Sequence, residues 1–120
     1  SRPEPPLPPP MDAPRTLKKR ADFLLARMAG QRWAATGLVL QMRKRHDDGP
    51  AQVGYTVSKK VGNAVERNRV RRRLRAAVRE VMQLQPGRDY VIIGRRAALA
   101  RSWQALIHDL RTAAHRVERR

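Results

Sequence analysis

The 120-residue chain contains no cysteine, and only 4% of its residues are aromatic. Without cysteine it can form neither a disulfide framework nor a thiolate metal site, and it has no thiol nucleophile. The scarcity of aromatics argues against affinity that comes mainly from stacking on many bases. No apolar run approaches the ~18 residues of a membrane-spanning helix, and the first residues lack the apolar core of a secretory signal. We therefore expect a cytoplasmic protein with no membrane contact.

Acidic residues are also few, because 10 Asp and Glu stand against 27 Lys and Arg, which leaves a formal net charge of +17. A compact chain with this imbalance repels itself and usually works against a polyanion. Nucleic acid is the first candidate for that polyanion.

Proline is scarce beyond the start of the chain, since seven of its nine occurrences fall within the first fourteen residues. A segment so rich in proline and poor in apolar side chains is typical of a polyproline-like or disordered chain. The length that follows suits one domain with one core. We therefore predict a disordered N-terminal extension over residues 1–15 and a single domain over residues 16–120.

The spacing of apolar residues predicts six elements in the order helix, strand, strand, helix, strand, helix. The expected ranges are 16–28 for a helix capped by Thr16, 38–42 and 53–57 for two strands, 63–84 for the second helix, 90–93 for the third strand, and 102–117 for a helix capped by Ser102. The turn signal Asp47-Asp48-Gly49-Pro50 predicts that the first two strands pair as a β-hairpin. This order fits an α+β fold in which helices pack on a small sheet.

The second predicted helix has two different faces. Asn63 followed by Glu66 resembles a capping box that begins it. With roughly 100° per residue, its apolar residues form one stripe: Val70, Leu74, Ala77, Val81 and Leu84. A polar row lies opposite: Asn68, Arg72, Arg75 and Arg79.

The charge of this helix is nearly all positive, because Glu66 and Glu80 are the only acids in residues 59–84. An ordinary solvated face mixes both signs. Arginine suits phosphate because its planar guanidinium donates two parallel hydrogen bonds and keeps its charge. The one-sided row therefore indicates binding of RNA or DNA.

No arrangement of residues typical of a protein catalyst is visible in the sequence. The acids are scattered and do not resemble the carboxylate set of two-metal nucleases. His108 and His115 are seven residues apart on the last predicted helix, roughly 10 Å along its axis, which is too far to share one metal ion. His46 has no identifiable partner for acid–base chemistry.

The block at residues 59–75, KKVGNAVERNRVRRRLR, resembles the signature of the protein component of bacterial ribonuclease P, with its Arg-Asn-Arg motif on a helix. Leu17-Lys18-Lys19 with Asp22-Phe23 resembles the start of the same family. The resemblance implies a small mixed sheet with a left-handed βαβ crossover, and it makes residues 16–120 a single RNA-binding α+β domain. It also implies a role as accessory subunit of the endonuclease that removes the 5′ leader from precursor tRNA. In that family the RNA subunit is the catalyst.

The resemblance assigns roles to individual residues. The residues expected against the catalytic RNA are Lys59, Lys60, Arg67, Asn68, Arg69, Arg71, Arg72 and Arg75. The precursor tRNA leader is expected in a cleft between the first helix and the sheet, near Phe23. Where many members carry two further aromatics, this chain has Arg27 and Gln41. A guanidinium plane at Arg27 can replace a stacking ring.

The resemblance further implies Mg²⁺ in the holoenzyme, bound mainly by RNA, with no catalytic residue, metal site or protein partner expected of this chain. Two other functions stay open at this point. A ribosomal or RNA-chaperone protein would use the same basic helix without a dedicated catalytic RNA. A nuclease in its own right would cleave precursor tRNA with no RNA subunit present.

Overall fold

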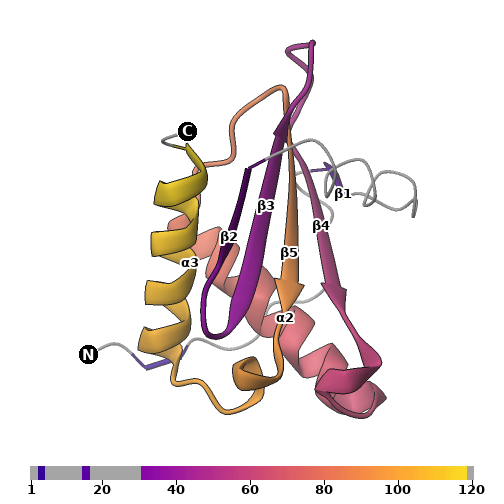
Figure 1. Ribbon diagram of the computed structural model, residues 1–120, viewed down its shortest axis with the longest axis vertical. Coiled ribbons are helices and arrows are strands. Elements are labelled where there is room, and N and C mark those ends of the chain that lie inside the picture. The colour runs from indigo at the N-terminus through magenta and orange to yellow at the C-terminus, as the bar shows by residue number, and fades with distance from the viewer. Residues whose placement is uncertain (1–2, 5–14, 17–30, 119–120) are drawn as a thin grey trace.

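The structure is a computed structural model, in which residues 3–4, 15–16 and 31–118 are described. Its strands are β1 (Arg15–Thr16), β2 (Gln31–Ala34), β3 (Leu38–Lys44), β4 (Gln52–Val57) and β5 (Arg88–Gly94). Its helices are α2 (Ala64–Val81) and α3 (Trp103–Glu118), with short 3₁₀ turns η1 (Lys59–Val61) and η2 (Arg96–Leu99). The strands form one mixed sheet in the order β1-β4-β5-β3-β2 (Figure 1). The predicted α+β class is confirmed.

The connection from β4 to β5 sets the topology. These two strands are parallel neighbours, and Val53 lies opposite Tyr90 in their register. In Figure 1 both strands run downward, β4 lies to the right of β5, and α2 passes behind the sheet between them. The crossover is therefore left-handed, as the resemblance implied, although such connections are rare.

The predicted hairpin between the strands at 38–42 and 53–57 is wrong. β5 lies between them, antiparallel to β3 and parallel to β4. The hairpin partner of β3 is β2, which is joined to it by a tight turn in which the N–H of Ala35 donates to the carbonyl of Leu38 at 2.8 Å. β2 was not predicted because it is a four-residue edge strand with polar residues at two of its positions.

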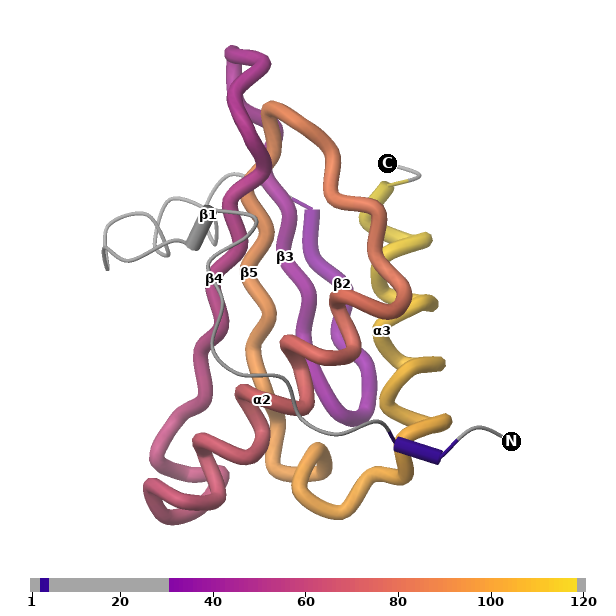
Figure 2. Tube along the Cα trace, turned by 180° about the vertical axis from the view of Figure 1, so that it is seen from behind, coloured from indigo at the N-terminus to yellow at the C-terminus, as the bar shows by residue number. Residues whose placement is uncertain are grey.

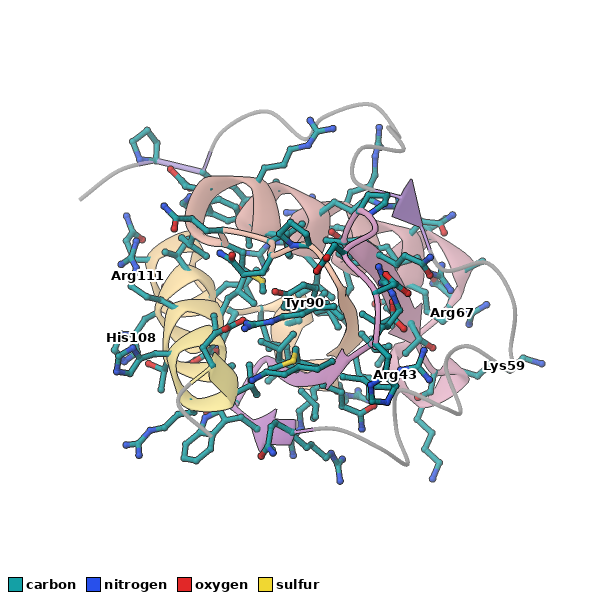
Figure 3. All side chains as sticks on the ribbon, turned by 90° about the horizontal axis from the view of Figure 1, so that it is seen from above. Arg43, Lys59, Arg67, Tyr90, His108 and Arg111 are labelled. Atoms are coloured by element: carbon teal, nitrogen blue, oxygen red, sulfur yellow. The ribbon has the colours of Figure 1, made fainter. Side chains whose placement is uncertain are left out.

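The core lies between α2, α3 and one face of the sheet. Alternate strand residues point toward the helices, among them Leu38, Leu40, Tyr90 and Ile92, which are all fully buried. α3 packs on β2 and β3, α2 packs on β4 and β5, and the two helices contact each other. Figure 3 shows this arrangement end-on, with both helices inside the curve of the sheet.

Capping fixes where both helices begin. The side chain of Asn63 accepts from the Glu66 N–H at 2.8 Å, and the Asn63 N–H donates to Glu66 Oε1 at 2.9 Å, so the predicted capping box is confirmed. α2 ends at Val81, three residues before the predicted end. Ser102 Oγ accepts from the Ala105 N–H at 3.2 Å and begins α3 as predicted.

The N-terminal predictions fall largely outside the described residues. Of the helix expected at 16–28, only Thr16 is described, and it ends β1. Of the extension expected to be disordered, Glu4 pairs with Arg73 at 3.1 Å, and Arg15 begins β1.

A buried carboxylate ties together the end of the sheet near the β3–β4 loop. Asp89 is 1% exposed and pairs with both Arg43 and Arg45, the latter at 2.6 Å. Arg45 also donates to Asp47 and to the Pro50 carbonyl, so one guanidinium joins the loop to β5. Its hydrogen bond to Asp47, helped by the N–H of Gly49, lowers the pKa of the Asp47 carboxyl.

Candidate nucleic-acid interface

The structure confirms that α2 has a buried face and a charged face. Val70, Leu74 and Ala77 are fully buried in the core. On the opposite face Asn68, Arg69, Arg72 and Arg79 are exposed, while Arg67, Arg71 and Arg75 are partly exposed. Figure 2, which views the molecule from the helix side, shows α2 crossing the sheet, so its outward face is an outer surface of the described fold.

These arginines are not neutralised from within the described residues. Arg67 donates to the Gly62 carbonyl at 2.8 Å and Arg71 to Asn68 Oδ1 at 2.9 Å, but both acceptors are uncharged. The ion pairs in the described ranges use other arginines: Arg43, Arg45, Arg73, Arg88 and Arg101. Glu66, the carboxylate nearest in sequence to the Arg-Asn-Arg motif, is engaged in the capping box. The positive charge of this face is therefore open to an external anion.

The turn η1 extends this charged face beyond the N-terminus of α2. Lys59 and Lys60 are exposed, whereas Val61 is buried and anchors the turn. A Cβ at Gly62 would collide with the side chain of Glu66, so the capping box needs glycine there. Lys59 and Arg67 lie on the same side of the molecule in Figure 3, opposite His108 and Arg111.

We name the set Lys59, Lys60, Arg67, Asn68, Arg69, Arg71, Arg72 and Arg75 the basic face. The structure places all eight predicted residues along η1 and α2. Arg73, in the middle of the same sequence run, does not belong to it, because it is 2% exposed. Its guanidinium donates to the carbonyls of Ala98 at 2.5 Å and Arg101 at 2.6 Å, which ties α2 to η2.

Tyr55 lies at the edge of the basic face, and the sequence did not indicate it as a site residue. The guanidinium carbon of Arg75 lies 5.2 Å from the ring centroid of Tyr55 on β4. Burial raises the pKa of Tyr55 to about 12, while the positive charges of Arg75 and Arg79 oppose that rise. Tyr55 lies within the strand predicted at 53–57, but its proximity to α2 depends on the crossover and is not encoded in the strand pattern.

Of the three residues predicted at the leader, only Gln41 is described. Phe23 and Arg27 are outside the described residues. Gln41 is 3% exposed on β3, opposite Arg32 of β2 and Val91 of β5, and its Oε1 atom has no hydrogen-bond partner among the described residues.

Histidines and acids do not gather into a metal site in the described part of the chain. No group of three or more His, Asp or Glu residues there could hold a metal ion. Asp89 and Asp109 are both buried and paired with arginines. Over the same residues, neither long helix has the apolar length needed to cross a membrane.

Fold and charge together define a small basic α+β protein whose outward arginine helix can bind the phosphates of RNA. Comparison with known proteins identifies the family within this class. The family model described as Ribonuclease P matches residues 11–118.

Curated relatives agree with this match. The "Ribonuclease P protein component" of Gluconacetobacter diazotrophicus is 52% identical over 102 residues, which cover 83% of this chain and 88% of the relative. The protein of the same name from Paramagnetospirillum magneticum is 49% identical, covering 84% of this chain and 80% of the relative.

Solved structures of RNase P proteins have the same fold as this chain. The RNase P protein from Thermotoga maritima superposes with a TM-score of 0.70 at 25% identity, over 86% of this chain and 97% of that one. The Staphylococcus aureus RNase P protein superposes with a TM-score of 0.67 at 27% identity, over 87% and 92% of the two chains.

The chain belongs to the ribonuclease P protein family. It is the RNA-binding protein subunit of the holoenzyme that matures the 5′ end of tRNA, and its partner is the ribonuclease P RNA. Nothing in the comparisons favours a ribosomal or RNA-chaperone role.

Proposed function

We propose that the chain binds the catalytic RNA through the basic face, and that it contacts the 5′ leader of precursor tRNA through Phe23, Arg27 and Gln41. The observation that carries the first part is the absence of ion pairs for the basic face within the described residues. Guanidinium groups at helical spacing repel each other, and phosphates of a folded RNA relieve that repulsion. The RNA phosphates thus supply the negative charge that the described residues do not place beside these arginines.

Gln41 would bring to the leader contact an amide oxygen that is buried and has no hydrogen-bond partner among the described residues. It can accept a hydrogen bond from an unpaired nucleotide only if the side chains that cover it move aside. The contributions of Phe23 and Arg27 rest on the family resemblance.

We further propose that the holoenzyme uses Mg²⁺. Two-metal chemistry requires converging carboxylates, and the described residues provide no such group. We propose that the metal is held by RNA, where it supplies charge neutralisation and activates the nucleophile. The protein contributes fixed positive charge beside it, which lowers the Mg²⁺ concentration that the complex requires.

Reconstitution with the cognate catalytic RNA tests this function. The double variant Arg69→Ala/Arg72→Ala removes two exposed charges of the basic face. We expect precursor cleavage to fall at least tenfold at low Mg²⁺ and to recover at high Mg²⁺, by analogy with the loss of two phosphate contacts.

The matched control is Lys44→Ala/Arg111→Ala, which removes the same charge from exposed residues outside α2. If both double variants behave alike, net charge alone matters and the basic face has no special role. Cleavage by the protein without any RNA subunit would instead establish a nuclease in its own right.

Affinity for the RNA should depend steeply on salt. If about 6 phosphates are neutralised, the slope of log K against log salt is roughly −5, by analogy with B-DNA. For the leader, Gln41→Met should reduce the preference of the holoenzyme for precursor over mature tRNA. An unchanged preference would remove Gln41 from the leader site.

A further inference from the structure

The C-terminal half of α2 meets β4 at a cluster that the predicted basic face includes only in part. Tyr55 projects from β4 toward α2 and packs against the core with part of its side chain. Arg75 lies over its ring at 5.2 Å, and Arg79 follows one helical turn later, exposed. Neither Tyr55 nor Arg79 belongs to the basic face as defined above.

The charge of this cluster is uncompensated within the described residues. Neither Arg75 nor Arg79 forms an ion pair or a side-chain hydrogen bond there. Two guanidinium groups at i and i+4 repel each other. Tyr55 cannot relieve this repulsion by ionising at neutral pH, because the ordinary pKa of tyrosine is about 10 and burial raises that of Tyr55 further, to about 12. Its hydroxyl is therefore a neutral donor and acceptor.

The ring of Tyr55 also restricts Arg75. A guanidinium stacked on an aromatic ring keeps its N–H donors in its own plane, free to point past the edge of the ring. An arginine on a bare helix loses side-chain entropy when it binds a phosphate, and a stacked one has already lost part of it. The ring therefore prepares Arg75 for a planar, two-bond contact with an oxyanion.

The position of the cluster indicates which anion it binds. Arg79 lies on the same face of α2 as Asn68 and Arg72, at i+11 and i+7 from them. Arg75 and Arg79 are roughly 6 Å apart along the axis. The cluster thus continues the basic face toward the C-terminal end of α2, where an RNA lying along the helix would place its next backbone phosphate.

We propose that Tyr55, Arg75 and Arg79 form a binding site for an RNA backbone phosphate, in which Tyr55 acts as a positioning residue for Arg75. This inference rests on the proposed binding of the catalytic RNA to α2. The phosphate accepts hydrogen bonds from Arg75 and Arg79, and Tyr55 acts only through its ring, which holds Arg75 in place.

The test measures binding of the full chain to its cognate catalytic RNA over a series of KCl concentrations. Arg79→Gln should lower the steepness of the salt slope by about 1, as expected for one lost phosphate contact. Tyr55→Leu should lower affinity about threefold, the size of an exposed cation–π contact. Tyr55→Phe keeps the ring and should retain most of that affinity.

A double-mutant cycle separates positioning from folding. In an Arg75→Gln background, Tyr55→Leu should cost no further affinity, because the ring acts only through Arg75. If the ring only stabilised the fold, Tyr55→Leu would lower the affinity for RNA by the same factor in the wild-type and Arg75→Gln backgrounds. Thermal unfolding of each variant shows whether it is folded, and Arg111→Gln on α3 is the control for loss of one exposed charge.

The outcomes distinguish this site from the function on which it rests. If Arg69→Ala/Arg72→Ala weakens binding while Arg79→Gln and Tyr55→Leu leave affinity and salt slope unchanged, the phosphate site is overturned and the basic face stands. If the wild-type chain does not bind the RNA, the proposed function itself falls. If the three residues are needed to bind polyglutamate but not RNA, the anion is a carboxylate and the assignment to RNA is wrong.

Discussion

Arginines at two regions of this molecule behave in opposite ways. Near the β3–β4 loop, Arg43 and Arg45 surround Asp89, a carboxylate that is 1% exposed. On α2, Arg69 and Arg72 stand exposed, and no carboxylate among the described residues pairs with either. Arginine side chains thus stabilise the sheet in the first region, whereas in the second their charge is available to an external anion.

The difference shows that net charge alone does not locate a binding surface. Arg73 lies within the densest basic run of the sequence, yet its guanidinium donates hydrogen bonds to two backbone carbonyls and pairs with Glu4. The proposed RNA-binding arginines are those whose positive charge is not paired with a carboxylate within the described residues. Substitutions should therefore separate the two groups by their effect on stability.

The largest effect is expected for Asp89→Asn. This change leaves Arg43 and Arg45 partly buried without a negative partner, and breaking a buried pair typically costs about 3 kcal/mol or more. Chemical unfolding should show this loss in the free energy of unfolding. Asp48→Asn, an exposed carboxylate of the adjacent loop, should change it by less than about 0.5 kcal/mol. Equal effects of the two substitutions would mean that the Asp89 cluster has no special structural role.

A moderate effect is expected where the fold supports the basic face. Asn63→Ala removes the side chain that accepts from the Glu66 N–H, and losing such a cap costs about 1 kcal/mol. Unfolding monitored by circular dichroism measures it. Asn63→Asp keeps an acceptor at the same place and should restore stability. If Asp fails to do so, the cap is not what anchors α2.

The smallest effect on stability is expected for Arg72→Gln. The side chain has no charged partner among the described residues, so the free energy of unfolding should stay within about 0.5 kcal/mol of the wild-type value. Any change should be a slight rise in the free energy of unfolding, because the substitution removes one repulsive pair of charges on the helix. Affinity for the catalytic RNA should fall nonetheless. A loss of stability above about 1 kcal/mol would place Arg72 with the structural arginines instead.

The sequence was informative wherever local rules decide the structure. The capping box at Asn63 and Glu66 and the two faces of α2 follow from helical spacing, and both are confirmed. The alternation at β3 and β4 likewise predicted two strands. Local rules do not say which strands pair, so the hairpin prediction was wrong.

The rest depends on contacts between distant parts of the chain. Asp89 meets Arg43 across 46 positions of sequence, and Arg73 meets the Ala98 carbonyl across 25. Tyr55 and Arg75 come together only because α2 crosses behind β4 and β5. No periodicity in the sequence encodes these encounters.

The crossover also has a consequence for how the chain folds. Because β5 inserts between β3 and β4, the sheet cannot be completed until the segment carrying α2 has closed a long loop, and non-local pairings of this kind form slowly. During that time the crowded guanidinium groups oppose compaction. A bound RNA counters this opposition and stabilises the native state by mass action. We therefore expect the free energy of unfolding of the protein to rise when it binds its RNA partner.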